Sequence, residues 1–275
     1  MEIVQGVQPH NEKARSVWNA PGGRYEEISR SIADAIEHAV ERLDPAPGER
    51  ILDLATGTGL ASRLIAQRLP GTSVTAVDIA DELLAAARVA AGKQQLTIEY
   101  IAADAEKLPF GDAHFDAVVS TFGVMFASRQ EAAASELARV VKPGGRVVLA
   151  TWKPDSNVAN MFGVMKPFMP PPVEPAPPSP FAWGSVQRLQ ELLGARFDLS
   201  FEQGTNQFRY ATGERAWQLW VNHYGPTLSL ARNLDDARRE AFKKAMIAWH
   251  ETFTSGLGYE QPRTYLITRA IRKSA

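Results

Sequence analysis

Short apolar runs alternate with amphipathic stretches across the middle of this chain. The apolar runs have the length and composition of buried strands, and they lie near residues 50–55, 73–78, 96–102, 115–121 and 146–152. The stretches between them repeat apolar residues at helical spacing, near residues 59–69, 81–91 and 130–141. This alternation predicts an α/β fold with a doubly wound, mostly parallel sheet and right-handed connections.

The chain before this core carries a single clear apolar stripe. Residues 26–43 place isoleucine, valine and leucine on one helical face, and Asp44 and Pro45 follow. They therefore predict one helix, which we expect to leave His38 on its solvated side. Residues 1–25 show only weak periodicity. We assign residues 1–47 to an N-terminal helical segment and residues 48–152 to the core.

The pattern breaks after Trp152, where prolines gather. These prolines argue against an α-helix or a central strand in this stretch. They are Pro167, Pro170, Pro171, Pro172, Pro175, Pro177, Pro178 and Pro180. Two interpretations stay open for this stretch. Prolines usually form a stiff surface linker, whereas the methionine and aromatic side chains among these would suit a lid or pocket wall.

The last third of the chain predicts further helices and the final strands. Residues 186–193, 214–224 and 235–253 have helical periodicity, while residues 197–210 and 264–272 resemble strands. We expect seven strands in all, with the two helices between the last two strands forming a helical cap. Residues 153–275 would then be a lid and cap region of the same domain.

The clearest candidate chemistry lies in the loop after the first predicted strand. The strand ends at Asp53, and a small-residue loop with Gly57 and Gly59 precedes the next helix. A strand, a glycine loop and a helix together predict a site for a nucleotide-like ligand. The next strand ends in Asp78, nineteen residues after Gly59, where doubly wound folds place an acid that binds ribose hydroxyls.

The position of Asp53 separates two kinds of ligand. A dinucleotide fingerprint has a third glycine and needs no acid just before the loop. A carboxylate there would repel a pyrophosphate and suit a cationic group such as an ammonium. The sequence therefore favours a ligand that is positively charged on this side.

The pattern Asp53-x-Ala55-x-Gly57-x-Gly59 followed by Asp78 resembles the cofactor signature of class I S-adenosylmethionine-dependent methyltransferases. Residues 103–110, 115–120 and 140–149 resemble later segments of the same family in the same order. The likeness is greatest to the branch with the ubiquinone and menaquinone C-methyltransferases. Ala55 stands where many members have a further glycine. The resemblance implies a Rossmann-like methyltransferase fold and S-adenosylmethionine as cofactor.

The resemblance also implies roles for the loop residues. Asp53 would meet the amino group of the cofactor, directly or through the loop amides, and Asp78 would bind the ribose. Ala55, Gly57 and Gly59 would let the backbone approach the cofactor closely. An alternative for Asp53 is that it only caps the following loop.

Further residues would surround the adenine. Ile79 and Leu83 would lie beside it, Asp104 would accept a hydrogen bond from its amino group, and Ala105 would offer a backbone amide. Asp104 has the alternative of simply beginning a turn.

Three more residues complete the predicted cofactor site. Ser120 and Phe122 would form its floor, and Tyr25 would close over the cofactor. Tyr25 has the alternative of packing on the helix that follows it.

A catalytic base is harder to find in the sequence. Methylation at oxygen or carbon usually requires removal of a proton, and histidine is the usual agent. His223 lies in an aromatic-rich predicted helix and is our candidate, with His250 a weaker one. For either residue, a histidine satisfied within the core is the alternative. Aromatic and methionine side chains in the second half favour a small, largely apolar acceptor.

The composition of the chain argues against several classes of function and partner. Thirty basic and 31 acidic residues give a net charge of −1, which argues against nucleic acid as a partner. The chain has no cysteine, no metal-ligand spacing and no apolar run long enough for membrane insertion, and its first residues do not predict a signal peptide. We expect a cytoplasmic monomer or homodimer without a metal.

Two alternatives from other classes remain. One is a non-catalytic protein that binds S-adenosylmethionine, because no base is evident. The other is an NAD-dependent oxidoreductase, which Asp53 and the missing third glycine disfavour.

Overall fold

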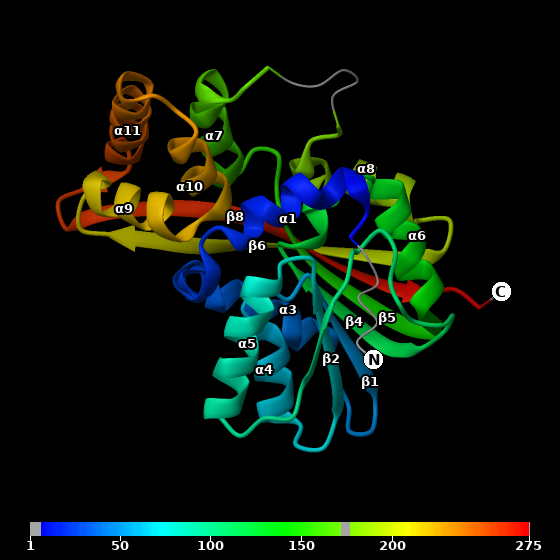
Figure 1. The fold of residues 1–275 in the computed structure, drawn as a ribbon. Helices are drawn as coiled ribbons and strands as arrows, with labels where there is room; N and C mark the ends of the chain where they lie inside the picture. The colour runs from blue at the N-terminus through cyan, green and yellow to red at the C-terminus, as the bar shows by residue number, and fades with distance from the viewer. Residues whose placement is uncertain (1–6, 172–176, 275) are drawn as a thin grey trace.

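A mixed sheet forms the centre of the protein, seen in a computed structural model that describes residues 7–171 and 177–274. The strand order is β3-β2-β1-β4-β5-β8-β6, and the short β7 pairs with β8 (Figure 1). The strands are β1 (Arg50–Leu54), β2 (Ser73–Asp78), β3 (Glu99–Ala102), β4 (Phe115–Thr121), β5 (Val141–Trp152), β6 (Phe197–Tyr210), β7 (Thr254–Ser255) and β8 (Gly258–Arg272). β1 to β5 pair in parallel, whereas β8 is antiparallel to β5 and β6. The predicted α/β fold with a mostly parallel sheet is confirmed, and β7 is an addition to the seven strands expected.

Helices cover both faces of this sheet. The core helices are α3 (Ala33–Leu43), α4 (Leu60–Arg68), α5 (Asp81–Lys93), α6 (Gln130–Val140) and α8 (Val186–Leu193). Figure 1 shows α3, α4 and α5 grouped on one side and α6 and α8 on the other. The central strands β1 and β4 are mostly apolar and mostly buried, as parallel strands between helix layers require.

The N-terminal helix predicted over residues 26–43 is in fact broken. α2 (Glu26–Arg30) is capped by Ser31, whose hydroxyl donates to the Ile28 carbonyl at 2.8 Å, and α3 begins two residues after Ser31. Ile32 lies between them with φ −124°, outside the helical range. The single-helix prediction was wrong here because the isoleucine stripe continues across the joint.

The cap contains three helices where two were predicted. α9 (Gly213–His223), α10 (Gly225–Arg232) and α11 (Asp236–Glu251) lie between β6 and β8 in the chain. With α7 (Asn157–Met165) they bury a second apolar cluster, which is separate from the core around the sheet. The sequence did not indicate α7, whose residues are apolar on most sides, nor α10, which starts at Gly225 and Pro226.

The first helix, α1 (Glu12–Asn19), lies across the carboxyl ends of the parallel strands, between α5 and α10 (Figure 1). It belongs to residues 1–25, for which the sequence pattern predicts only weak helical character. No helix within residues 7–171 and 177–274 combines the length and the apolar character needed to cross a membrane.

Candidate functional site

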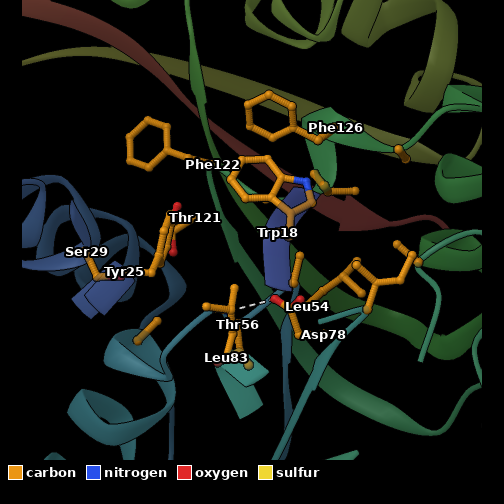
Figure 2. Close-up of a pocket in the computed structure, with 18 of the residues that line it drawn as sticks. Trp18, Tyr25, Ser29, Leu54, Thr56, Asp78, Leu83, Thr121, Phe122 and Phe126 are labelled. Atoms are coloured by element: carbon orange, nitrogen blue, oxygen red, sulfur yellow. Dashed lines mark hydrogen bonds between the residues drawn. The ribbon is translucent and has the colours of Figure 1, made fainter. Parts of the chain in front are cut away.

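A pocket opens at the carboxyl ends of β1, β2 and β4, beneath α1. This is the edge where open α/β sheets bind ligands. Figure 2 shows that its two ends differ in chemistry. Asp78 and Leu83 lie at one end, while Phe122, Trp18 and Phe126 gather at the other.

The loop between β1 and α4 is held in an unusual backbone conformation. Ala55, Gly57 and Gly59 have φ values of 56°, 58° and 80°, which lie in the left-handed region. A Cβ on Gly59 would come within 2.8 Å of the Tyr100 hydroxyl and 3.0 Å of the Ala87 Cβ, so only glycine fits there. Ala55 and Gly57 line the pocket, whereas Gly59 lies behind it.

Asp53 holds this loop in place through hydrogen bonds. Its side chain is fully buried, and one carboxylate oxygen accepts hydrogen bonds from the Thr56 hydroxyl at 2.5 Å and the Ser62 N–H at 2.9 Å. The other oxygen has no hydrogen-bond partner among the described residues. Burial raises the pKa of Asp53 to about 6. Asp53 does not line the pocket, so any contact with a ligand runs through the loop in this conformation.

Asp78 lies at the pocket wall, at the end of β2. One of its oxygens accepts from the Gly57 N–H at 2.7 Å, and the other accepts from the Ala80 N–H at 2.9 Å. Burial also raises the pKa of Asp78 to about 6, against the opposing effect of these two hydrogen bonds. Ile79 and Leu83 line the pocket beside it.

Asp104 also lines the pocket, but its carboxylate is already engaged. One oxygen accepts from the Gln8 N–H at 3.0 Å and from the Asn11 side-chain amide at 2.9 Å. The other oxygen accepts from the Glu106 N–H at 2.9 Å. Asp104 therefore fastens the chain before α1 to the loop after β3, and Ala105 lies next to it in the pocket wall.

Phe122 begins the aromatic end of the pocket, and its backbone has φ 59°, which bulky L residues rarely adopt. Its ring stacks on Trp152 with 4.0 Å between centroids and 21° between planes. Tyr265 packs edge-on against Phe122 with centroids 5.9 Å apart. Of these three rings only Phe122 lines the pocket, so Trp152 and Tyr265 support it from behind.

The N-terminal helices supply the opposite wall. Trp18 of α1 meets Phe126 edge-on, with centroids 4.9 Å apart, and the half-buried Tyr25 packs against Gly57. Burial and the nearby Asp78 carboxylate raise the pKa of Tyr25, so its hydroxyl stays protonated at neutral pH. Both walls thus present neutral rings.

Most residues predicted for the cofactor site line this one pocket. They are Tyr25, Ala55, Gly57, Asp78, Ile79, Leu83, Asp104, Ala105 and Phe122. Asp53, Gly59 and Ser120 do not line it. Ser120 is fully buried, and its hydroxyl donates to the Leu54 carbonyl at 2.7 Å, so it joins β4 to β1 instead.

The histidines are not where a base would be needed. His223 does not line the pocket; its Nδ1–H donates to the Leu219 carbonyl at 3.0 Å, and its Nε2 lies 3.1 Å from Glu27. His223 is therefore not placed to remove a proton from an acceptor in this pocket. His250 is fully buried beside Tyr259, and burial lowers its pKa to about 3. The expectation that His38 is solvated was wrong, because it bonds the Tyr265 hydroxyl at 2.9 Å.

Several lining residues were not predicted from the sequence because they come from the N-terminal helices or from the end of β4 and the segment after it. They are Asn11, Ala14, Trp18, Ser29, Ile32, Ile36, Thr121 and Phe126. The isoleucines were visible only as an apolar stripe, which does not tell a pocket wall from a core. Trp18 in a mostly polar helix was the best available signal.

No lysine, arginine or histidine lines the pocket among the residues that the structure describes. Over the same ranges, no group of three or more histidine, aspartate or glutamate side chains is arranged to hold a metal ion. The described residues flanking the proline-rich stretch do not line the pocket either, and 172–176 lie outside the described residues.

Comparison with known proteins identifies the family. Residues 52–149 match a family described as a methyltransferase domain. An uncharacterised protein of Mycobacterium tuberculosis is 35% identical over 192 residues, which cover 69% of either chain. A demethylmenaquinone methyltransferase of Thermus thermophilus is 45% identical over 123 residues, or 45% of this chain and 54% of that one.

The chain belongs to the class I S-adenosylmethionine-dependent methyltransferases.

The fold of this methyltransferase agrees with solved structures. A putative methyltransferase from Bacillus halodurans superposes with a TM-score of 0.60, over 87% of this chain and 99% of that one, at 20% sequence identity. The region that matches the family runs from β1 to β5. The pocket walls formed by Trp18, Tyr25 and Ile32 therefore lie outside that region of the methyltransferase.

Proposed function

We propose that this methyltransferase binds S-adenosylmethionine at the acidic end of the pocket and methylates a small, largely apolar acceptor at the aromatic end. The observation that carries the proposal is the division of one pocket into two chemically different halves. The acidic half holds Asp78 and Asp104. The aromatic half holds Trp18, Phe122 and Phe126.

The acidic half has the hydrogen-bond acceptors that the cofactor would need. Asp78 would accept hydrogen bonds from the ribose hydroxyls, and Asp104 and Ala105 would face the adenine amino group and ring. Asp53 would act through the loop, because its second carboxylate oxygen is buried and has no partner among the described residues. Two buried carboxylates with raised pKa values gain stability when a ligand brings hydrogen-bond donors or positive charge.

When bound, S-adenosylmethionine supplies an electrophilic methyl group on a sulfonium. The pocket residues then have to hold the acceptor in line with that group and keep water out, which can contribute roughly 7–11 kcal/mol. Phe122, Ile32 and Ile36 would do this, because they are apolar and line the same pocket as Ala55 and Gly57 of the glycine loop. Aromatic rings near a sulfonium also stabilise its charge.

The aromatic half favours a neutral acceptor. The described residues of the pocket include no cation that would bind a carboxylate or phosphate, and the net charge of −1 does not suit a nucleic acid. They include no histidine base either, so the acceptor atom must be nucleophilic itself or release its proton to water. We therefore propose methylation at an oxygen or at an activated carbon of a small, quinone-like or natural-product molecule.

Two measurements test the proposal. Calorimetry should show binding of S-adenosylhomocysteine, and radiolabelled S-adenosylmethionine should transfer its label to one or more members of a panel of small phenols, quinols and enols. Cofactor binding with no transfer over a broad panel would favour a non-catalytic binder. Binding of NAD in place of S-adenosylhomocysteine would contradict the proposal.

The acceptor half has its own test. Phe126→Ala should lower the rate of methyl transfer about tenfold or more while changing the affinity for S-adenosylhomocysteine less than about threefold, because the ring lies at the end remote from Asp78. Val89→Ala on the exposed face of α5 is the matched control, since it truncates an apolar side chain far from the pocket wall. Equal loss of cofactor binding and transfer in Phe126→Ala would contradict the division into two halves.

A further inference from the structure

Arg263, in the middle of β8, is a buried cation whose hydrogen-bond partners are neutral groups. Its side chain is 1% exposed, and its Nε donates to the Asn206 side-chain oxygen at 2.7 Å. Its Nη2 donates to the Ser31 carbonyl at 2.6 Å. The guanidinium lies 4.5 Å from the ring centroid of Phe208, and burial lowers the pKa of Arg263 to about 10. Burying such a charge costs free energy. We therefore ask which part of the protein the contacts of Arg263 stabilise.

What they hold is the joint between α2 and α3. Ser31 is the C-cap residue of α2, where helix carbonyls lack partners within the helix. Asn206, directly opposite Arg263 in the sheet register, donates its side-chain amide to the same Ser31 carbonyl at 3.1 Å and to Asp34 at 2.5 Å. Two paired strands, β6 and β8, therefore close on one break in the N-terminal helices.

The other side of α2 contacts the glycine loop. The hydroxyls of Ser29 and Thr58 lie 3.1 Å apart, and the Glu26 carboxylate pairs with Arg63 at 2.8 Å. Arg63 is itself buried and donates to the Thr58 carbonyl. α2 is thus fixed to the loop by one set of contacts and to the β6–β8 pair by another.

A five-residue helix has little stability of its own, so contacts with the rest of the protein decide where it lies. α2 carries Ser29, which lines the pocket, and follows Tyr25, whose ring lies against Gly57. We propose that Arg263 is a positioning residue: by fixing the α2–α3 joint it holds Tyr25 and Ser29 against the loop at residues 56–59. The inference rests on the proposed function only in taking this loop as the cofactor site.

Arg263→Met removes the charge and the hydrogen bonds to Asn206 and Ser31 while keeping an unbranched apolar side chain. Arg272→Met is the matched control, because Arg272 is on the same strand, lies 5.7 Å from the Phe197 ring and donates to the Ala138 and Arg196 carbonyls. Hydrogen–deuterium exchange on the cofactor-free protein should be faster at residues 26–31 and 56–62 in Arg263→Met only. The affinity for S-adenosylhomocysteine should fall about tenfold, since the loop is no longer preorganised. Unchanged exchange at residues 56–62 would overturn the inference.

Two further variants keep the test decisive if Arg263→Met does not fold. Asn206→Ala keeps the Arg263–Ser31 hydrogen bond but removes one donor to Ser31 and the acceptor of the Arg263 Nε, and it should raise exchange at the same two segments by a smaller amount. Arg263→Lys restores the charge without the two-pronged geometry, so it should recover only part of the affinity. Normal exchange in Asn206→Ala, in a folded protein, would count against the role of the joint. Failure of the wild-type protein to bind S-adenosylhomocysteine would contradict the proposed function, whereas the exchange data would still decide the role of Arg263.

Discussion

The backbone N–H of Gly57 donates a hydrogen bond of 2.7 Å to the carboxylate of Asp78, and this bond ties the loop after β1 to the end of β2. The strand register places Leu54 beside Val77, so the two loops start side by side. The second oxygen of Asp78 holds the N–H of Ala80 at the beginning of α5. One carboxylate therefore organises both loops at the acidic end of the pocket.

Asp78→Ala should weaken binding of S-adenosylhomocysteine about 10- to 100-fold. Hydrogen bonds to a charged group contribute roughly 1.5–3 kcal/mol each, and the loop would also lose its contact with Gly57. Isothermal titration calorimetry measures the effect. Asp116→Ala is the control, because Asp116 contacts Arg50 and Lys142 at the opposite end of β4. Unchanged affinity in Asp78→Ala would contradict the ribose assignment.

The affinity for S-adenosylhomocysteine should rise from pH 5 to pH 7. Asp53 and Asp78 have pKa values raised to about 6 by burial, so below that pH the empty pocket retains protons. A ligand with hydrogen-bond donors favours the ionised carboxylates, and binding therefore releases protons. The affinity should change by up to about tenfold per pH unit for each proton released. In Asp78→Asn the dependence should be flatter.

The raised pKa values of Asp53 and Asp78 have the opposite effect on the stability of the empty protein, because they lower its free energy of unfolding as the pH rises. Between about pH 4 and pH 6 the folded state binds protons that the unfolded chain has lost. The contribution of these two groups to the free energy of unfolding is thus largest at low pH and is lost as the pH rises through about 6. Urea titrations of wild type and Asp78→Asn across this range measure it, and identical pH profiles would contradict the raised pKa of Asp78.

Phe122→Gly should be more stable than Phe122→Ala, although glycine usually destabilises. Both variants lose the ring, but only glycine adopts φ 59° without a steric penalty. The expected difference in the free energy of unfolding is about 1 kcal/mol. Phe126 is the matched control, since it ends the short 3-10 helix Val124–Phe126, and there alanine should be the more stable substitution. If alanine were the more stable substitution at both positions, the backbone of Phe122 would not be strained.

Gly123→Ala should destabilise the protein by about 1–3 kcal/mol through overpacking. A Cβ at this position would lie 2.4 Å from the Ala55 Cβ and 2.7 Å from the Ala55 carbonyl oxygen, where β4 and β1 end side by side. Gly163→Ala in α7 is the control, because no atom lies within 4 Å of the added Cβ, and it should be neutral or stabilising. Thermal unfolding that is unchanged in Gly123→Ala would contradict this close approach.

His223→Ala should leave the rate of methyl transfer within about threefold of wild type. General bases typically contribute 10²–10⁴-fold, and His223 faces Glu27 rather than the pocket. The measurement is turnover with an acceptor found in the labelled screen. A loss of a hundredfold or more would restore His223 as the base and require the cap to move. Thermal unfolding of the same variant separates a local packing effect from a chemical one.

The sequence predicted the core well because its signals there are local. Glycines and acids mark the strand ends at β1 and β2, and apolar runs between two helix layers mark β1 and β4. Pro262 explains why β8 was expected to begin at residue 264. Proline cannot donate to a strand partner, yet it pairs with Gln207 inside this long strand.

Features that depend on contacts between residues far apart in the chain could not be predicted from the sequence. The break between α2 and α3 coincides with contacts from Asn206 and Arg263, which lie far along the chain. The side of Trp18 that meets Phe126 is decided by the cap and the strand ends together. A local pattern marks an apolar residue, but it does not say whether that residue faces a core or a cavity.

The engagement of Asp104 has a consequence for any purine that enters the pocket. Both protein donors to one of its oxygens, the Gln8 N–H and the Asn11 amide, belong to the segment that leads into α1. An incoming exocyclic amine would compete with that segment for the same lone pairs. A purine in the pocket and the segment that leads into α1 would therefore share one hydrogen-bond acceptor. The binding of the purine and the attachment of α1 are coupled through this carboxylate.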